Sequence, residues 1–200
     1  MINPQPAGLQ LTISYCSCCY QPANCQLNII FASMKILMVC LGNICRSPLA
    51  EGVLKHKAFK AGLHWSIESA GTNGCHTGDP PHPLSQKVAR LNGIDICQQR
   101  ARNFVPEDFE VYDKIYALAG DVLDDIRCIA KDKFDASKVD LLMNELYPGR
   151  NMDVPDPWYG AEPGYHEVYK LIDKVCDKII EKASLNPSGG GTLQASLNLK

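Results

Sequence analysis

Cys40 and Arg46 are the two residues of this chain whose types and spacing are best suited to chemistry. They lie in the stretch Cys40-Leu-Gly-Asn-Ile-Cys-Arg-Ser-Pro48, which directly follows the apolar run Lys35-Ile-Leu-Met-Val39. A strand, a tight loop and a helix in succession direct backbone N–H groups and the positive end of the helix at one point, which makes a binding site for an anion. We expect phosphate to bind here, with a thiol below it and a guanidinium beside it.

The residue types around Cys40 suit nucleophilic attack on a bound phosphate. A helix N-terminus and a nearby arginine lower the pKa of a thiol by several units, so we expect Cys40 to be a thiolate at neutral pH. Arg46 offers parallel donors that match two phosphate oxygens. Gly42 and Asn43 tolerate a left-handed backbone, and Ser47 can donate its hydroxyl to the Cys40 sulfur. The alternative is a structural thiol at a chance spacing, but the surrounding strand, turn and helix signals favour catalysis.

The elements that position this loop alternate between strand and helix. The pattern predicts strands at residues 35–39, 64–69, 114–118 and 138–142, and helices at residues 48–61, 83–92, 121–130 and 164–183, with a short helical turn starting in residues 105–109. The first strand, helix and strand form a right-handed crossover, so the sheet is parallel. We therefore expect an α/β fold, a single-domain four-stranded parallel sheet with helices on both faces and the phosphate-binding loop after strand one.

A long loop after the fourth strand, which we call the late loop, carries a second candidate for catalysis. Four prolines prevent regular structure there, namely Pro148, Pro155, Pro157 and Pro163. Ligands of open parallel sheets bind beyond the carboxyl ends of the strands, so this loop can reach the edge where Cys40 lies. Asp156 in this loop can then face the phosphate from the opposite side and act as a general acid. The alternative is that Asp156-Pro157 only initiates a turn.

Composition and charge exclude several classes of protein. The chain has 200 residues with 46% hydrophobic content, which suits one core and one domain. A net charge of −2 and scattered basic residues give no electrostatic footprint for nucleic acid or for an anionic membrane surface. No apolar run approaches the roughly 18 residues of a membrane span. The 10 cysteines lack the spacing of a disulfide framework, so we expect a reducing, cytoplasmic compartment.

The two ends of the chain are expected to lie outside the functional domain. Residues 1–33 carry no charged side chain, so they do not resemble a secretory signal, and we expect a loose or artefactual leader before a functional start at Met34. The leader contains no histidine or carboxylate, and its cysteines lack paired metal-binding spacing, so no metal or cofactor is expected at Cys16, Cys18, Cys19 and Cys25. The domain should span residues 34–184, followed by a disordered tail at residues 185–200.

Three motifs together resemble one enzyme family. They are Val39-Cys-Leu-Gly-Asn-Ile-Cys-Arg-Ser-Pro-Leu-Ala-Glu51, Ser69-Ala-Gly-Thr72 and Asp156-Pro-Trp-Tyr-Gly160. The sequence is similar to the low-molecular-weight protein tyrosine phosphatases along about 150 residues, from Met34 to Ala183. The resemblance implies that Cys40 is the nucleophile, Arg46 binds phosphate and Asp156 is the general acid.

The resemblance also implies a set of substrate contacts and a hydrogen-bond network. Ser69 is implied to join the network beneath the loop. Cys45 can reach Cys40 across a curled loop and form a disulfide, or it is a small buried thiol; the resemblance favours a reversible redox shield for Cys40. The substrate-binding residues expected are Leu41, Gly42, Asn43, Ile44, Cys45, Ser47, Trp158 and Tyr159.

Three positions depart from the family pattern. Asn92-Gly93 replaces a His-Gly pair, which removes an imidazole from the network beneath the loop. Leu118-Ala119 replaces Met-Asp, which removes a carboxylate near the late loop. Cys75-His76 stands where eukaryotic relatives have an aromatic residue, so Trp158 and Tyr159 are expected to supply the aromatic clamp. His76 and His82 are not expected to take part in catalysis.

The function expected from this reading is hydrolysis of phosphotyrosine in proteins or peptides through a cysteinyl-phosphate intermediate. A first alternative is a protein-arginine phosphatase, although the resemblance implies that the arginine phosphatases of this family have threonine at the position of Ile44. A second is an arsenate reductase, which needs two further cysteines after the third strand, where only Cys128 lies. A third is a catalytically weak phosphopeptide-binding module, against which an intact set of Cys40, Arg46 and Asp156 argues.

Overall fold

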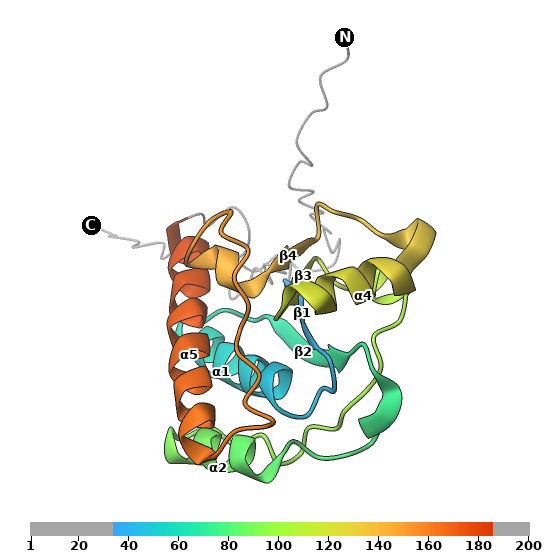
Figure 1. The fold of residues 1–200 in the computed structure, drawn as a ribbon. Helices are drawn as coiled ribbons and strands as arrows, with labels where there is room; N and C mark the ends of the chain where they lie inside the picture. The colour runs from blue at the N-terminus through green and yellow to red at the C-terminus, as the bar shows by residue number, and fades with distance from the viewer. Residues whose placement is uncertain (1–33, 186–200) are drawn as a thin grey trace, which may run out of the picture. The chain divides into compact units, whose positions relative to one another are not determined.

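Four parallel strands form the sheet at the centre of the domain (Figure 1). The computed structural model describes residues 34–185. Within this part of the chain the sheet has the order β2-β1-β3-β4, with every neighbouring pair parallel. The strands are β1 Lys35–Cys40, β2 Ser66–Gly71, β3 Lys114–Ala117 and β4 Val139–Leu141. The predicted four-stranded parallel sheet is therefore confirmed.

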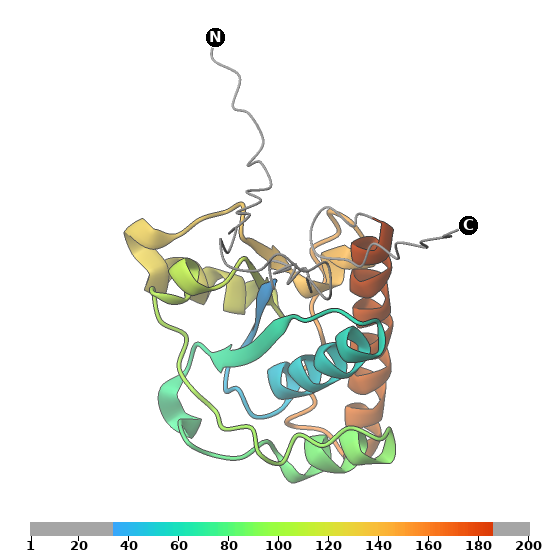
Figure 2. The same ribbon diagram turned by 180° about the vertical axis from the view of Figure 1, so that it is seen from behind.

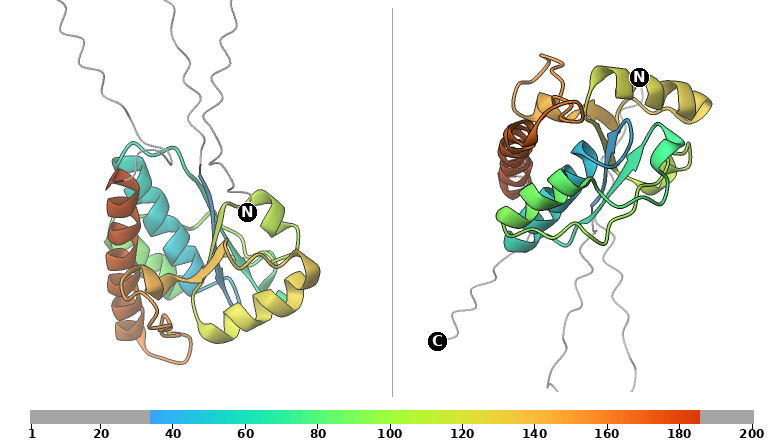
Figure 3. Two further views of the ribbon diagram at one scale, coloured as in Figure 1. Left: turned by 90° about the horizontal axis from the view of Figure 1, so that it is seen from above. Right: turned by 60° about the horizontal axis from the view of Figure 1, so that its bottom comes forward.

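Helices cover both faces of this sheet, as predicted (Figures 2 and 3). The view from above in Figure 3 shows α1, α2 and α5 on one side of the strands and α4 on the other. Short 3₁₀ turns occur at Gly74–His76, Lys131–Lys133 and Leu142–Glu145. The α-helices are α1 Arg46–Lys60, α2 Pro83–Leu91, α3 Asp108–Val111, α4 Gly120–Ala130 and α5 Glu162–Leu185.

The central strand β1 is buried on both faces because its side chains alternate between two cores. The larger core holds Ile36, Met38 and Cys40 together with residues of α1, α2 and α5. The smaller core holds Leu37 and Val39 together with residues of α3 and α4. A strand with both faces covered reads as a continuous apolar run, which is what the sequence has here. Burial on both faces fixes the end of β1, and with it the position of Cys40.

Several element boundaries differ from the predicted ones by one to three residues. The first helix begins at Arg46 and not at Pro48, because the first helical N–H groups need no intrahelical acceptor and proline is tolerated throughout that turn. The second strand begins at Ser66 and not at residue 64, since its pairing starts opposite Lys35. The last helix begins at Glu162 and includes Pro163, again within a first turn.

The predicted leader and most of the predicted tail lie outside the described residues. Leu185, assigned to the tail from sequence, is the last residue of α5. The leader cysteines considered as metal ligands also lie outside the described part. Between residues 34 and 185, no group of three or more histidine, cysteine or acidic side chains is arranged to hold a metal ion. In the same range, no helix combines the length and the apolar character needed to cross a membrane.

The packing of α5 into the larger core should contribute strongly to the stability of the domain. Ile172 is fully buried in the larger core, whereas Lys174, two residues later, is exposed. Replacing Ile172→Ala removes buried methyl groups and leaves a cavity, so we expect the free energy of unfolding to fall by about 2–5 kcal/mol. Urea denaturation of this variant and of a Lys174→Ala control measures the difference. A loss of less than about 0.5 kcal/mol for Ile172→Ala would contradict the packing described above.

Candidate active site

The phosphate loop, residues 41–45, connects the end of β1 to the start of α1. Asn43 adopts the predicted left-handed backbone, with φ of 54°. The sequence predicts the same for Gly42, but Gly42 does not have a positive φ. Its lack of a side chain serves close packing instead, because a Cβ at Gly42 would lie 3.2 Å from Cδ2 of His76. The loop therefore depends on one left-handed residue and one close approach.

Cys40 lies at the carboxyl end of β1 with its sulfur enclosed by hydrogen-bond donors. The residue is 2% exposed. Its Sγ lies 3.0 Å from Ser47 Oγ and accepts a hydrogen bond of 3.2 Å from the backbone N–H of Asn43. The N–H groups of the first turn of α1, which begins at Arg46, have no acceptor within the helix. This arrangement offers several donors to an anion, and it confirms the predicted contact between Ser47 and Cys40.

A hydrogen-bond network beneath the loop holds Asn43 in place. The amide Nδ2 of Asn43 donates to Ser47 Oγ at 2.8 Å and to Ser69 Oγ at 2.9 Å. Its Oδ1 accepts from the backbone N–H of Arg102 at 2.9 Å. Ser69 in turn donates to a carboxylate oxygen of Glu51 at 2.6 Å. The expected membership of Ser69 in this network is confirmed, while Glu51 and Arg102 were not foreseen from the sequence.

Asn92, considered as the site of a missing imidazole, is not part of this network. It follows α2, and its Nδ2 donates to the carbonyl of Val88 at 2.8 Å. The residue closes its own helix and is exposed. The network instead ends at Glu51, so the substitution at Asn92 does not interrupt the support of the loop.

The segment after β2 supports the loop from its other side. A Cβ at Gly71 would lie 2.8 Å from the carbonyl oxygen of Leu41 and 3.0 Å from the backbone nitrogen of Asn43. The backbone N–H of Thr72 donates to the carbonyl of Cys40 at 3.0 Å, and that of Asn73 donates to Leu41 at 2.8 Å. Only glycine permits the two backbones to approach this closely.

Arg46 and Asp156, which lie 110 residues apart in the sequence, form an ion pair at the loop. Arg46 Nη2 donates to Asp156 Oδ2 at 2.8 Å, and Nη1 donates to the carbonyl of Val154 at 3.3 Å. The Arg46 side chain is 7% exposed and that of Asp156 is 38% exposed. The second carboxylate oxygen of Asp156 accepts from the backbone N–H of Trp158 at 3.1 Å. The structure thus brings the late loop to the phosphate loop, as the sequence predicts.

Two backbone anchors hold the late loop in this position. The N–H of Val154 donates to the carbonyl of Leu118 at 2.8 Å, directly beyond β3. Asp153 Oδ1 accepts from the N–H of Gly120 at the start of α4, also at 2.8 Å. Ala119, noted for its missing carboxylate, is 4% exposed and lies between these two anchors. A carboxylate from the late loop therefore caps α4 in this chain.

Aromatic and imidazole rings form a wall beside the loop. The Trp158 ring lies 5.8 Å from that of His76 and 5.4 Å from that of His82, between ring centroids. His82 stacks on Tyr165 at 5.2 Å, and burial lowers the pKa of His82, which favours a neutral ring. The sequence did not indicate a role for either histidine in this wall. The signal that could have found His76 is that it stands where eukaryotic relatives have an aromatic residue. Tyr159 is 94% exposed, and its role in substrate binding stays a prediction.

The loop side chains expected to bind substrate differ in their exposure. Leu41 is 40% exposed and lies at the rim. The other expected loop residues with side chains are buried, each 7% exposed or less, and these are Asn43, Ile44, Cys45 and Ser47. Direct contact of these residues with a substrate stays a prediction.

Cys45 faces away from the phosphate loop toward the last helix. Its Sγ lies 3.7 Å from Tyr165 Oη, and its carbonyl accepts from Ser85 Oγ at 3.3 Å. Cys40 and Cys45 are both free thiols in this structure. Burial raises the pKa of Cys45 to about 11, so its thiol is protonated at neutral pH. The redox pairing with Cys40 stays a prediction.

This protonation makes a prediction for chemical labelling. Thiolates and not thiols react with iodoacetamide, so Cys45 should resist alkylation at pH 7 and react faster as the pH approaches 11. The exposed thiol of Cys75 serves as the reference within the same protein. Peptide mass spectrometry after timed labelling measures both rates. Labelling of Cys45 at pH 7 as fast as that of Cys75 would contradict its burial.

Comparison with known proteins gives a consistent picture. A family model described as low molecular weight phosphotyrosine protein phosphatase matches residues 35–188. The phosphatase YfkJ of Bacillus subtilis is 36% identical over 149 residues, which cover 74% of this chain and 94% of the relative. The human low molecular weight phosphotyrosine protein phosphatase is 33% identical over 155 residues, covering 76% of this chain and 97% of the human protein.

Solved structures agree with these sequence matches. The crystal structure of YfkJ has a TM-score of 0.71 at 33% identity and covers 78% of this chain and 97% of YfkJ. Wzb of Vibrio vulnificus, solved in complex with benzylphosphonate, has a TM-score of 0.68 at 26% identity and covers 76% of this chain and 99% of Wzb. With the loop geometry described above, these matches show that the chain is an enzyme of the low-molecular-weight protein tyrosine phosphatase family.

Proposed function

We propose that this enzyme hydrolyses phosphotyrosine in proteins or peptides through a cysteinyl-phosphate intermediate. The observation that carries the proposal is the meeting of Cys40, Arg46 and Asp156 at one edge of the sheet, with Asp156 bonded to Arg46 at 2.8 Å. A thiol within a ring of donors can bind and attack a phosphate group. A carboxyl group on the opposite side can protonate the oxygen that leaves.

In the first step the Cys40 thiolate attacks phosphorus. The sulfur–phosphorus bond forms while the bond from phosphorus to the tyrosine oxygen breaks. Asp156, protonated at this point, gives its proton to the leaving oxygen, so a neutral phenol departs. Arg46 and the N–H groups at the start of α1 bind the phosphate oxygens, where negative charge collects in the transition state.

In the second step a water molecule replaces the phenol and attacks the same phosphorus. Asp156, now a carboxylate, takes a proton from this water. The oxygen–phosphorus bond forms and the sulfur–phosphorus bond breaks, which returns Cys40 as a thiolate and releases inorganic phosphate. The two steps need one acid that becomes a base, and Asp156 serves both.

The Arg46–Asp156 ion pair implies an exchange of partners on substrate binding. A phosphate dianion that enters the loop offers two oxygens to the Arg46 guanidinium, which matches its geometry better than one carboxylate oxygen. Asp156 then leaves Arg46 and becomes free to face the leaving oxygen. Its side chain, 38% exposed, has room for this movement.

The depth of the nucleophile supports tyrosine over serine as the substrate residue. Cys40 is 2% exposed, whereas Trp158 and Leu41 at the rim are 42% and 40% exposed. Only a long, flat side chain carries its phosphate past this rim, so phosphoserine stops short. Benzylphosphonate, a phosphonate that carries an aromatic ring, is bound by the structurally similar Wzb, which supports this choice.

A protein-arginine phosphatase is the second candidate. The arginine phosphatase YwlE shares the fold with a TM-score of 0.69, at 24% identity. Ile44 is 7% exposed and belongs to the larger core. Its aliphatic side chain has no hydroxyl group to present to a guanidinium-bearing substrate. This residue favours phosphotyrosine in the present chain.

Two further expectations concern regulation and rival chemistry. A peroxide can oxidise the Cys40 thiolate to a sulfenic acid, and attack by the Cys45 sulfur with loss of water then forms a disulfide between the two. This disulfide would shield Cys40 from further oxidation, and we retain it as a proposal, with both thiols free in this structure. Cys128 is an exposed residue of α4, and arsenate reduction would need a second cysteine beside it. We also retain the proposal of a cytoplasmic enzyme that acts without a cofactor.

The roles of Cys40 and Asp156 can be tested with an aryl phosphate whose leaving phenol is as basic as tyrosine. Cys40→Ser should abolish turnover, since a hydroxyl is a far weaker nucleophile than a thiolate. Asp156→Ala should lower kcat by about 10²- to 10⁴-fold through loss of the general acid. Glu162→Gln, which alters an exposed carboxylate paired with Lys87, is the control and should retain near-normal kcat. Turnover by Cys40→Ser, or an unchanged kcat in Asp156→Ala, would refute the assignment.

The substrate preference can be tested with three peptides of identical sequence that carry phosphotyrosine, phosphoserine or phosphoarginine. The enzyme should have its highest kcat/KM on phosphotyrosine, and Ile44→Thr should move the ratio toward phosphoarginine because it adds a hydroxyl at the loop. Ile44→Val, which changes volume without adding a hydroxyl, is the matched control. A wild-type preference for phosphoarginine would show that the pocket selects differently.

A further inference from the structure

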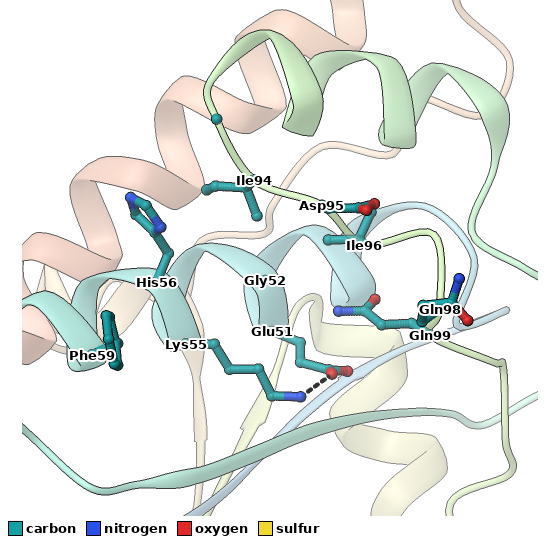
Figure 4. A pocket seen from close by; sticks show the side chains of 11 residues that line it. Glu51, Gly52, Lys55, His56, Phe59, Ile94, Asp95, Ile96, Gln98 and Gln99 are labelled. Atoms are coloured by element: carbon teal, nitrogen blue, oxygen red, sulfur yellow. Dashed lines mark hydrogen bonds and ion pairs between the residues drawn. The ribbon is translucent and has the colours of Figure 1, made fainter.

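A buried carboxylate that the proposed reaction does not use lies at the end of the network beneath the loop. Glu51, on α1, is 6% exposed. Its Oε2 accepts a hydrogen bond from Ser69 at 2.6 Å, and its Oε1 accepts one from Lys55 Nζ, also at 2.6 Å. Figure 4 shows the Glu51–Lys55 contact and the surface pocket that Glu51, Gln99 and His56 help to line. One oxygen of Glu51 is thus bonded to the network and the other to Lys55.

The charge of Glu51 sets the direction of the next hydrogen bond. An ionised carboxylate can only accept, so the Ser69 hydroxyl must donate its single proton to Glu51. The Ser69 oxygen can then only accept a hydrogen bond from Asn43. The Asn43 amide therefore presents its Nδ2 to Ser69, at 2.9 Å.

A second fixed donor confirms the orientation of this amide from its other end. The backbone N–H of Arg102 can only donate, and it donates to Asn43 Oδ1 at 2.9 Å. With Oδ1 occupied there, the remaining amide hydrogen of Nδ2 points to Ser47 Oγ at 2.8 Å. Asn43 is therefore the donor in its hydrogen bonds to both Ser69 and Ser47.

This direction decides where the Ser47 proton goes. Since Ser47 Oγ accepts from Asn43, its own proton is free for Cys40 Sγ at 3.0 Å. The other acceptor within reach is the carbonyl of Ala70, at the longer distance of 3.4 Å. If the Asn43 amide were reversed, the Ser47 proton would point to Oδ1 and the sulfur would lose this donor.

We propose that Glu51 is a positioning residue whose carboxylate orients the Ser69–Asn43–Ser47 chain so that Ser47 donates its proton to the Cys40 sulfur. The residue touches neither substrate nor phosphate and acts only through this chain, which we call the Glu51 relay. The inference rests on the proposed role of Cys40 as the nucleophile. Hydrogen bonds donated to a sulfur favour its anionic form, so the relay maintains the reactive state of Cys40.

The charges around both ends of the relay define what a pH experiment measures. Glu51 faces the Lys55 ammonium group, and His56 and Asp95 line the same pocket. At the other end, Arg46 follows the phosphate loop as the first residue of α1 and is paired with Asp156. Lys55 offsets the charge of Glu51, so the carboxylate acts through hydrogen-bond direction more than through its field.

The test is the pH dependence of Cys40 alkylation, which requires no turnover. Glu51→Gln replaces an acceptor-only group with an amide that can also donate to Ser69, and the direction of the relay is then no longer enforced. We expect the alkylation profile of Cys40 to move upward by about one pH unit, which is about a tenfold slower reaction at a fixed pH below the midpoint. The acid limb of kcat/KM should move by the same amount. Ser69→Ala should reproduce the shift, and combining the two should add little to it.

Glu68→Gln is the matched control for this experiment. Glu68 is next to Ser69 in β2, where it accepts from Tyr112 Oη at 2.6 Å and lies 3.9 Å from the Arg102 guanidinium. The variant therefore removes one carboxylate charge beside the relay without removing any of the relay's own hydrogen bonds. Its profile should match that of the wild type. An unshifted profile in both Glu51→Gln and Ser69→Ala would overturn the proposal, even if either variant were less stable. If Cys40→Ser retained turnover, the proposed function would fail while the alkylation result would stand.

Discussion

The left-handed backbone of Asn43 is the constraint on which the active site depends. A residue with φ of 54° turns the chain sharply enough for its N–H to donate to Cys40 Sγ at 3.2 Å, three residues earlier in the sequence. Such a conformation is unfavourable for most side chains and persists only when the surroundings fix it. Here the Asn43 side chain is 2% exposed and bonded to Ser47, Ser69 and the backbone of Arg102. A buried amide with three partners thus holds the conformation that shapes the anion site.

The carboxylate of Asp156, the proposed acid, is held in a different way. Side chains support the phosphate loop from below, whereas Asp153 and Val154 attach the late loop to Gly120 and Leu118. Between these contacts and α5, Asp156 is bonded to Arg46 and to the N–H of Trp158. A nucleophile benefits from a fixed position, while a group that must serve as acid and then as base benefits from freedom to move. The two halves of the site are built accordingly.

Local sequence was sufficient to predict the sheet, its helices and the phosphate loop, because their signals lie within short stretches. The apolar run of β1, the Gly42-Asn43 pair and Pro48 each constrain only their neighbours. The Ser47–Cys40 contact was foreseen for the same reason, since both residues belong to one loop. The left-handed backbone expected at Gly42 is not found, and the close contact at this position comes from the His76 side chain, far along the chain.

What the sequence did not reveal depends on contacts between distant segments. Glu51 reads as an ordinary polar position of a helix until β2 places Ser69 against it. His76 and His82 read as surface residues until the late loop brings Trp158 between them. The ion pair of Arg46 with Asp156 likewise needs the full path of the chain around the sheet. Each of these is a property of the tertiary fold and has no local signature.

The separation of 110 residues between Arg46 and Asp156 has a consequence for how the domain folds. The phosphate loop comes from the start of the domain, but Asp156, its proposed acid, arrives with the late loop, and Tyr165, the neighbour of Cys45, arrives with α5. Contacts of such long range close late, because the chain must first lose the entropy of the loop between them. A nascent chain that has released only β1 to β4 therefore has the proposed nucleophile without the proposed acid. Under the proposed mechanism, catalytic activity consequently reports that the late loop has reached the phosphate loop as well as that the sheet has formed.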